Sequence, residues 1–178
     1  HVYRADYQKF VEAHVQRDAD VTVLTGEVDV LDASAFGCVQ LSPQGRITSF
    51  VEKPIDPTPY ALDGKCLINL GVYCFQTRFL VQALIEDAKL ESSSHDFGKD
   101  VLPRALDRAF VSSCGLEVIT PDATAYWRDV GSIDSYFQAN MDLLTGNRLF
   151  DLRDQRWASC SRFHEWVPSR CSLTAEIN

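Results

Sequence analysis

The apolar positions along this chain alternate between a spacing typical of helices and one typical of strands. Asp6 is a candidate N-cap, and the helix that follows it is predicted to bury one face formed by Tyr7, Phe10, Val11 and His14. The β-branched residues of Val21–Val28 predict a strand. The first part of the chain is therefore expected to contribute one helix and one strand.

The next part of the chain predicts a hairpin and a central strand. The segments Gly37–Leu41 and Arg46–Glu52 flank the turn residues Ser-Pro-Gln-Gly, which predicts a hairpin over residues 37–52. Ile55–Asp63 contains two prolines and is predicted to be a loop. The continuous apolar run Cys66–Phe75 is short enough for a buried central strand.

The remaining periodic segments predict helices on either side of one further strand. A helix is expected from about Thr77, with Phe79, Leu80, Ala83 and Leu84 facing inward. After a loop over Glu91–Asp96, residues 99–110 predict a second amphipathic helix, with Pro103 tolerated in its first turn. Leu116–Thr120 predicts a strand, and Ile133–Leu144 a third helix. This alternation predicts an α/β fold with a layered sheet, mixed because the hairpin adds antiparallel pairing.

Composition narrows the class of protein. The 178 residues are 46% hydrophobic and 24% charged, which is typical of one globular domain or most of one. No apolar run is long enough to span a bilayer, and the N-terminus has no signal-peptide pattern. A net charge of −8 argues against a nucleic-acid partner but leaves a small anionic substrate possible. The six cysteines form no CxxC pair and are interpreted as buried thiols of a reduced cytosol: Cys38, Cys66, Cys74, Cys114, Cys160 and Cys171.

Two strand segments carry candidate binding residues. In Phe-Val-Glu-Lys-Pro (residues 50–54), a Glu-Lys pair at a strand end is most often a solvated turn. The functional interpretation places Lys53 on a phosphate and Glu52 on sugar hydroxyls, because α/β sheets gather ligands at strand ends. In the apolar strand, Gly71 permits close approach of a backbone or a ligand, and Asn69 and Tyr73 share its face by the period of two.

Two loop segments carry candidate metal ligands. His95 and Asp96 could bind a metal, but Ser-His-Asp before a helix is more often an N-terminal cap, and no second His or Cys lies at zinc-ligand spacing. Asp129, in Tyr-Trp-Arg-Asp-Val-Gly, is a weak metal site by itself, because Mg²⁺ usually needs carboxylates together with substrate phosphates. From local chemistry alone, a structural role for Asp129 is the simpler interpretation.

Taken in order, the motifs resemble those of the ADP-glucose pyrophosphorylase (glucose-1-phosphate adenylyltransferase) family. The matching segments are HVYRADY, ASAFG, FVEKP, NLGVYCF, SSHDFGKDVLP and AYWRDVGSIDSYFQANMDL. EKP is shared among sugar-phosphate nucleotidyltransferases, whereas HDFGKDVLP together with YWRDVGS is more specific to this family. The resemblance implies part of a Rossmann-like nucleotidyltransferase domain with a mixed sheet. Residues 1–145 would form its sugar-phosphate-binding part, and residues 146–178 a linker toward a C-terminal β-helix domain.

The resemblance also implies a reaction and the residues that perform it. Glucose 1-phosphate attacks the α-phosphorus of ATP, which gives ADP-glucose and pyrophosphate with Mg²⁺ as the cofactor. Lys53 and Asp129 match catalytic residues, and Asp129 matches one of two aspartates that hold the metal. The residues implied in binding glucose 1-phosphate are Gly37, Glu52, Lys53, Asn69, Tyr73, Asp96, Phe97 and Trp127.

The family further implies a cytoplasmic, allosterically regulated homotetramer that serves glycogen or starch synthesis. Asn69 departs from the serine common in the family. The glycine-rich nucleotide loop, the second metal aspartate directly before the position of His1, and the β-helix domain have no counterpart in this chain, so the isolated chain is expected to be inactive. Two alternatives stay open: a nucleotidyltransferase that uses UTP, dTTP or GTP, and a non-catalytic regulatory subunit that binds ligands without turnover.

Overall fold

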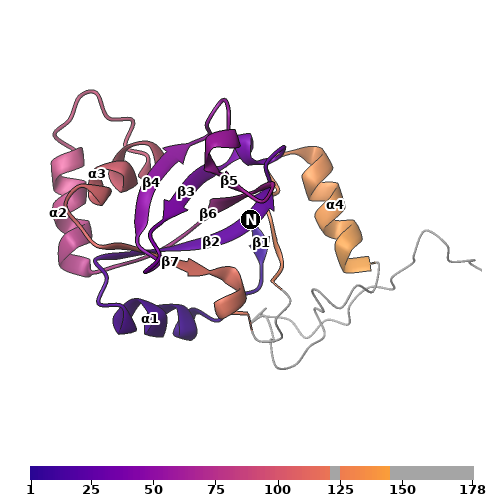
Figure 1. The fold of residues 1–178 in the computed structure, drawn as a ribbon, viewed down its shortest axis with the longest axis horizontal. Coiled ribbons are helices and arrows are strands. Elements are labelled where there is room, and N and C mark those ends of the chain that lie inside the picture. The colour runs from indigo at the N-terminus through magenta and orange to yellow at the C-terminus, as the bar shows by residue number, and fades with distance from the viewer. Residues whose placement is uncertain (121–124, 145–178) are drawn as a thin grey trace, which may run out of the picture. The chain divides into compact units, whose positions relative to one another are not determined.

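The computed structural model describes residues 1–120 and 125–144 (Figure 1). The described residues divide into two compact units, one formed by residues 5–120 and a second formed by His1–Arg4 with residues 125–144. The larger unit contains a mixed sheet with helices, which confirms the predicted α/β class. The smaller unit pairs two short antiparallel strands and continues into a helix; these elements are β1 (Val2–Tyr3), β8 (Trp127–Arg128) and α4 (Ile133–Leu144).

The sheet of the larger unit has the strand order β4-β3-β6-β2-β7, and β5 pairs with β6 beside this path. Its strands are β2 (Val21–Asp29), β3 (Gly37–Leu41), β4 (Ile47–Glu52), β5 (Ala61–Leu62), β6 (Lys65–Phe75) and β7 (Val111–Gly115). β2 runs antiparallel to β6 and parallel to β7, so the sheet is mixed, as predicted.

The hairpin and the central strand are both confirmed. β3 and β4 pair antiparallel with Gly37 opposite Glu52, and Gly45 takes a left-handed φ of 77° in the connecting turn. β6 lies between β3 and β2, as expected for a central strand. Its burial is less complete than predicted: Cys66, Ile68 and Leu70 are buried, while the stretch from Gly71 to Phe75 is half-buried or exposed.

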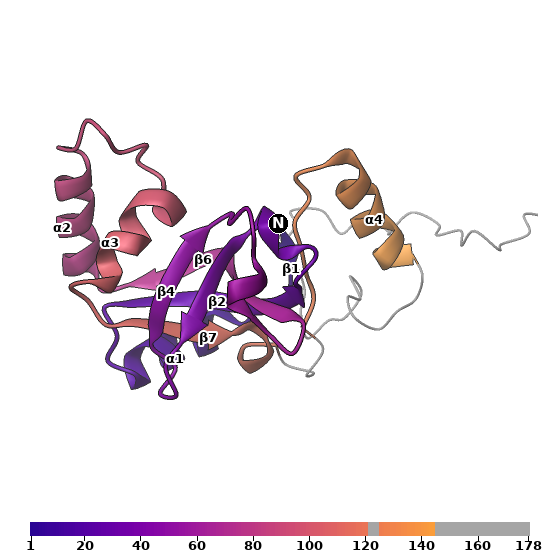
Figure 2. The ribbon, with the colours of Figure 1, turned by 45° about the horizontal axis from the view of Figure 1, so that its top comes forward.

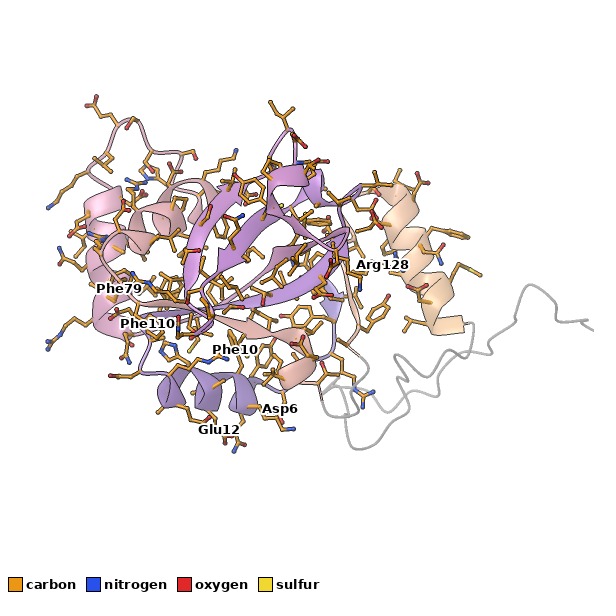
Figure 3. The ribbon with its side chains drawn as sticks, viewed as in Figure 1. Asp6, Phe10, Glu12, Phe79, Phe110 and Arg128 are labelled. Atoms are coloured by element: carbon orange, nitrogen blue, oxygen red, sulfur yellow. The ribbon has the colours of Figure 1, made fainter. Side chains whose placement is uncertain are left out.

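Helix α1 (Tyr7–Gln16) begins at the predicted cap. Asp6 Oδ1 accepts hydrogen bonds from the backbone N–H groups of Gln8 and Lys9 at 3.0 and 3.2 Å. The predicted buried face is confirmed for Phe10 and His14 and is wrong for Tyr7 and Val11, which are about half exposed. Figure 3 shows Phe10 on the side of α1 nearer the sheet. The buried face of α1 is therefore a single i, i+4 pair, Phe10 and His14, and is narrower than the predicted face of four residues.

Helices cover both faces of the sheet (Figure 2). On one face, His14 of α1 contacts the side chain of Thr22. On the other, the apolar core joins Val21 and Val23 to the helical segment after residue 96. Thr22 and its neighbours Val21 and Val23 point to opposite faces of β2, so α1 and the helical segment after residue 96 lie on opposite sides of the sheet. The core cluster comprises Val21, Val23, Val39, Ile47, Phe50, Leu102, Ala105, Ala109 and Val111.

The helices of the second layer depart in detail from the prediction. α2 (Thr77–Asp87) buries Ala83, but Leu84 is 41% exposed rather than inward-facing. The helix predicted over residues 99–110 is instead a π-helical turn, η3 (Phe97–Val101), followed by the short helix α3 (Leu102–Leu106). Pro103 does lie in the first turn of α3, where its missing N–H costs no hydrogen bond.

The strand predicted over Leu116–Thr120 is wrong. That segment begins with a 3₁₀ turn, η4 (Leu116–Val118), and the strand is β7, directly before it. The hydrophobicity pattern did not predict β7, because two of its buried residues are serines. The guanidinium of Arg17 donates to the Ser112 hydroxyl at 2.9 Å, and the Ser113 hydroxyl lies 2.8 Å from that of Thr25. Two more 3₁₀ turns, η1 (Ala33–Ala35) and η2 (Thr58–Tyr60), lie in loops, the second with β5 inside the predicted loop over Ile55–Asp63.

The cysteines of the described residues are free thiols. Cys38, Cys66 and Cys114 are buried and Cys74 is half-buried, which confirms the buried-thiol interpretation for three of them. Burial, with the neighbouring Cys66, raises the pKa of the Cys38 thiol to about 11. Cys160, Cys171 and the linker predicted over residues 146–178 lie outside the described residues. Within the described ranges, no helix has the length and apolar character required to cross a membrane.

Candidate functional site

The carboxylate of Glu52 lies between two glycine backbones. A Cβ atom at Gly37 would stand 2.6 Å from Glu52 Oε2, and a Cβ atom at Gly98 would stand at the same distance. Gly37 is the cross-strand partner of Glu52, whereas Gly98 belongs to η3. Only glycine leaves room for the acid at both positions, because real Cβ atoms do not approach an oxygen so closely. The fold therefore encloses the Glu52 side chain from two sides.

The electrostatic surroundings of Glu52 are mixed. Burial raises the pKa of Glu52 above its usual value, the positive charges of Lys53 and Lys99 oppose this shift, and the negative charge of Asp96 adds to it. The carboxylate thus has two lysines and one acid close enough to affect it. An ionised carboxylate accepts hydrogen bonds strongly, so Glu52 can hold one or more hydroxyl groups of a sugar.

Lys53 follows β4 in an unusual backbone conformation. Its φ is 49°, in the left-handed region, and its backbone N–H donates to the Phe36 carbonyl at 3.1 Å. A non-glycine residue in this region costs of order 1–3 kcal/mol, and such residues cluster at functional sites. The side chain is exposed, so its ammonium group is available to an anion in solution.

Three aromatic rings gather beside these residues. Phe97 of η3 stacks on Tyr73 of β6 with a centroid distance of 5.6 Å and lies 5.7 Å from Phe75. Burial raises the pKa of Tyr73, and the nearby charges of Glu52 and Asp96 add to the shift. Tyr73 and Phe97 were both predicted as sugar-pocket residues, and the structure brings them together from segments that are distant in sequence.

The side chain of Asn69 is hydrogen-bonded to that of Tyr73. Its side-chain amide donates to the Tyr73 hydroxyl at 2.8 Å, and its Oδ1 accepts from the N–H of Gly71 at 2.9 Å. Gly71 has a φ of 75°, which no β-branched residue adopts without strain. The bond between Asn69 and Tyr73 agrees with the prediction that the two share a face.

Asp96 is a helix cap, as the simpler of its two interpretations predicted. Its Oδ1 accepts from the backbone N–H groups of Gly98 and Lys99 at 2.8 and 2.9 Å. His95 does not share a metal site with it, because His95 Nδ1 lies 2.7 Å from Asp87 Oδ2. The roles of Gly98 and Lys99 beside Glu52 were missed from the sequence, although both residues belong to the motif HDFGKD.

Asp129 and Trp127 belong to the smaller unit. β1 pairs with β8 so that Val2 is opposite Arg128 and Tyr3 opposite Trp127. This register brings His1 to both predicted residues: its ring lies 4.9 Å from that of Trp127, and its Nε2 lies 3.5 Å from Asp129 Oδ1. The adjacent Arg128 is occupied in an ion pair with Asp142 of α4 at 2.7 Å.

The chemistry of Asp129 suits a metal ligand that acts with substrate phosphates. The carboxylate is 42% exposed and its ion-pair partner among the described residues is a histidine, which is charged only when protonated. Within residues 1–120 and 125–144 there is no group of three or more His, Cys, Asp or Glu side chains arranged to enclose a metal. Mg²⁺ does not require such a cage, because it keeps several waters and is commonly bound by one or two carboxylates and phosphate oxygens.

Comparison with known proteins agrees with these motifs. The nucleotidyl transferase family model matches residues 1–146. Among curated proteins, the chain is 42% identical over its full length to glucose-1-phosphate adenylyltransferase 2 of Vibrio parahaemolyticus, of which it covers 45%. It is 40% identical over 96% of its length to glucose-1-phosphate adenylyltransferase of Nitrosomonas europaea, and covers 40% of that protein. The corresponding protein of Rhodopseudomonas palustris is 43% identical over 88% of the chain. The chain thus spans less than half the length of these relatives.

Proposed function

From the premise that this chain belongs to the nucleotidyl transferase family, we propose that it carries the sugar-phosphate-binding part of a glucose-1-phosphate adenylyltransferase. The whole enzyme transfers an adenylyl group from ATP to glucose 1-phosphate and releases pyrophosphate. The relatives that support this substrate pair bear that activity in their names. The choice of ATP rests on this similarity.

The observation that carries the proposal is the grouping of Glu52, Lys53, Tyr73 and Phe97. Glu52 lies between Gly37 and Gly98 in a position to accept hydrogen bonds from sugar hydroxyls. The stacked rings of Tyr73 and Phe97 offer an apolar surface to the sugar. Lys53, next to Glu52 and exposed, offers a positive charge to the phosphate. Together these residues offer contacts to the hydroxyl groups, the ring and the phosphate of a sugar phosphate.

We assign Asp129 as the proposed Mg²⁺ ligand and Trp127 as part of the proposed sugar pocket. When bound, the metal neutralises charge on the phosphates and orients the displacement. The contact of His1 with Asp129 supports this assignment, because the family resemblance places the second metal aspartate directly before the position of His1. The proposal also includes a cytoplasmic, allosterically regulated homotetramer as the form of the whole enzyme in glycogen or starch synthesis. These features rest on the family resemblance.

The test of activity uses the full-length protein that contains this chain. Purified protein is mixed with glucose 1-phosphate, Mg²⁺ and one of ATP, UTP, dTTP or GTP, and pyrophosphate release is followed. Preference for ATP supports the proposal. Preference for another nucleotide indicates a different sugar-1-phosphate nucleotidyltransferase, and binding of glucose 1-phosphate without turnover indicates a regulatory subunit.

Lys53→Gln tests the phosphate-binding role. The substitution removes a hydrogen bond to a charged group, worth about 1.5–3 kcal/mol, so the KM for glucose 1-phosphate is expected to rise about 10–150-fold. The KM for ATP is expected to change much less. Lys65→Gln, which removes an exposed lysine paired with Glu27, serves as the control. Equal weakening toward both substrates excludes this role for Lys53.

A further inference from the structure

The carboxylate of Asp87 is buried where a negative charge is unfavourable. Asp87 is the last residue of α2, and its side chain is 6% exposed. The carbonyl end of a helix carries partial negative charge, which repels an acid. A buried charge is also costly unless it is paired and hydrogen-bonded. Asp87 therefore depends on the partners that surround it.

These partners come from two other segments. The Ser93 hydroxyl donates to Asp87 Oδ1 at 2.7 Å, and His95 Nδ1 lies 2.7 Å from Oδ2. The guanidinium of Arg104, from α3, forms an ion pair with Oδ1. Hydrogen bonds from Ser93 and His95 lower the pKa of Asp87, so the group is ionised at neutral pH. One carboxylate thus joins α2, α3 and the connection between them, residues 88–96.

The connection is held in a strained conformation at its last turn. The backbone φ of His95 is 60°, in the left-handed region that residues other than glycine rarely adopt. His95 comes directly before Asp96 and Phe97, so its backbone angles set the direction in which the chain enters η3. The bond between its ring and Asp87 opposes relaxation of this conformation.

A second carboxylate fixes the same turn from the other side. Asp100 Oδ2 accepts from the backbone N–H groups of Ser94 and Asp96 at 3.1 and 3.2 Å, and from the Ser94 hydroxyl at 2.6 Å. Arg104 lies 3.5 Å from Asp100 as well as contacting Asp87. The arginine therefore couples the two acids, and the turn before Asp96 is anchored at both ends.

The residues that follow this turn are those of the candidate site. Phe97 stacks on Tyr73, and the backbone of Gly98 packs on the Glu52 carboxylate. We propose that Asp87 is a positioning residue for sugar-phosphate binding: through Ser93, His95 and Arg104 it fixes the 88–96 connection, and so places Phe97 and Gly98 against Tyr73 and Glu52. This inference rests on the proposed function of that site.

The test compares two neighbouring acids of α2 in the full-length protein. Asp87→Ala is expected to raise the KM for glucose 1-phosphate about ten-fold, the lower end of the range for lost hydrogen bonds to a charged group, and the KM for ATP less than about two-fold. Glu86→Ala is the matched control, because the Glu86 side chain pairs with Arg108, just after α3, and forms no hydrogen bond to the 88–96 connection among the described contacts. The control is expected to keep both KM values.

A second pair of variants separates positioning from direct contact with substrate. His95→Gly and His95→Ala both remove the bond to Asp87, but only glycine adopts a φ of 60° without strain. Positioning predicts that His95→Ala raises the KM for glucose 1-phosphate more than His95→Gly does. Equal effects of the two variants contradict a part for the left-handed backbone of His95 in placing Phe97 and Gly98.

The outcomes distinguish failure of the proposed function from failure of the positioning role of Asp87. A wild-type protein that neither binds glucose 1-phosphate nor turns it over overturns the proposed function itself. A wild-type protein that is active, with Asp87→Ala kinetically equal to Glu86→Ala, overturns only the positioning role. Where Asp87→Ala melts below the assay temperature, Asp87→Asn takes its place: it keeps the shape of the side chain and loses the charge that holds Arg104, and the same KM comparison decides.

Discussion

At Gly98, one methyl group would occupy the space of the Glu52 carboxylate. The Cβ of Gly98→Ala would stand 2.6 Å from Glu52 Oε2, so the acid must move. A displacement of about 1 Å at a positioned group costs on the order of 100-fold in activity, so kcat/KM for glucose 1-phosphate is expected to fall about 10–100-fold. Gly26→Ala is the control, because its Cβ would stand 3.2 Å from Leu70, which has to give by only a few tenths of an ångström, and would meet no residue of the site. Unchanged kinetics in Gly98→Ala argue against a binding role for Glu52.

Asp129 offers a residue-scale test of the metal. Asp129→Asn keeps the shape of the side chain but removes a metal-binding charge, so turnover is expected to fall on the order of a thousand-fold. The carboxylate is 42% exposed, so the melting temperature should change little. Asp134→Asn, an exposed acid in the first turn of α4, is the matched control. A variant that melts early and keeps its turnover would instead support a structural role.

At the scale of the element, the cap of α1 is the simplest contact to test. Asp6→Ala removes the acceptor for two backbone N–H groups and is expected to lower the free energy of unfolding by about 1 kcal/mol. The melting temperature should fall by about 4 °C. Glu12→Gln, on the exposed side of the same helix, should leave it unchanged (Figure 3). Thermal unfolding followed by circular dichroism measures both, and equal melting temperatures would mean that solvent replaces the cap.

The elements could be predicted where the pattern of apolar residues matches the surface that they bury. α4 has the predicted bounds, and the β3–β4 hairpin follows from its turn residues. β7 could not be predicted in this way, because Ser112 and Ser113 are buried through hydrogen bonds to Arg17 and Thr25, residues about ninety positions away. The helix over residues 99–110 was predicted too long, because periodicity does not separate a π-helical turn from an α-helix.

The candidate site could be predicted residue by residue, but not as an arrangement. The motifs named Glu52, Tyr73 and Phe97, and the fold brings these three together from β4, β6 and η3. The contact between Gly98 and Glu52 joins segments whose separation in sequence gives no sign of it. The role of Asp87 was missed for the same reason, since an acid at a helix end usually faces solvent. The binding roles of Glu52, Tyr73 and Phe97 remain predictions, as do those of Trp127 and Asp129.

At the scale of the whole molecule, His14 makes stability depend on pH. The ring is buried between α1 and β2 with Nδ1 2.8 Å from the Thr22 hydroxyl, and burial lowers the pKa of His14, against the opposing charge of Asp20. The unfolded chain, with an ordinary histidine pKa near 6.5, then binds more protons than the folded one as the pH falls below this value. The free energy of unfolding is therefore expected to be fully retained above about pH 6.5 and to decrease below it.

The measurement is urea unfolding between pH 7.5 and pH 5.5. His14→Gln replaces the ring with a group that does not titrate and can still contact Thr22, so its free energy of unfolding should depend less on pH in this window. Carboxylates with lowered pKa values, such as Asp100, lose their contribution only at more acidic pH. A wild-type curve and a His14→Gln curve with the same slope would show that His14 is not the source of the pH dependence.

The pairing of β2 also has a consequence for how the chain folds. Val21 is opposite Phe75 on one side and Val111 on the other, so the partners of this apolar strand follow it by 54 and 90 positions. The β3–β4 hairpin needs only local contacts and can form in about 1–10 μs. At a synthesis rate of about 5–20 residues per second, β2 instead leaves the ribosome roughly 5–18 s before the parallel strand that pairs with it. During that interval Val21, Val23 and Leu24 are open to a chaperone or to aggregation with another nascent chain.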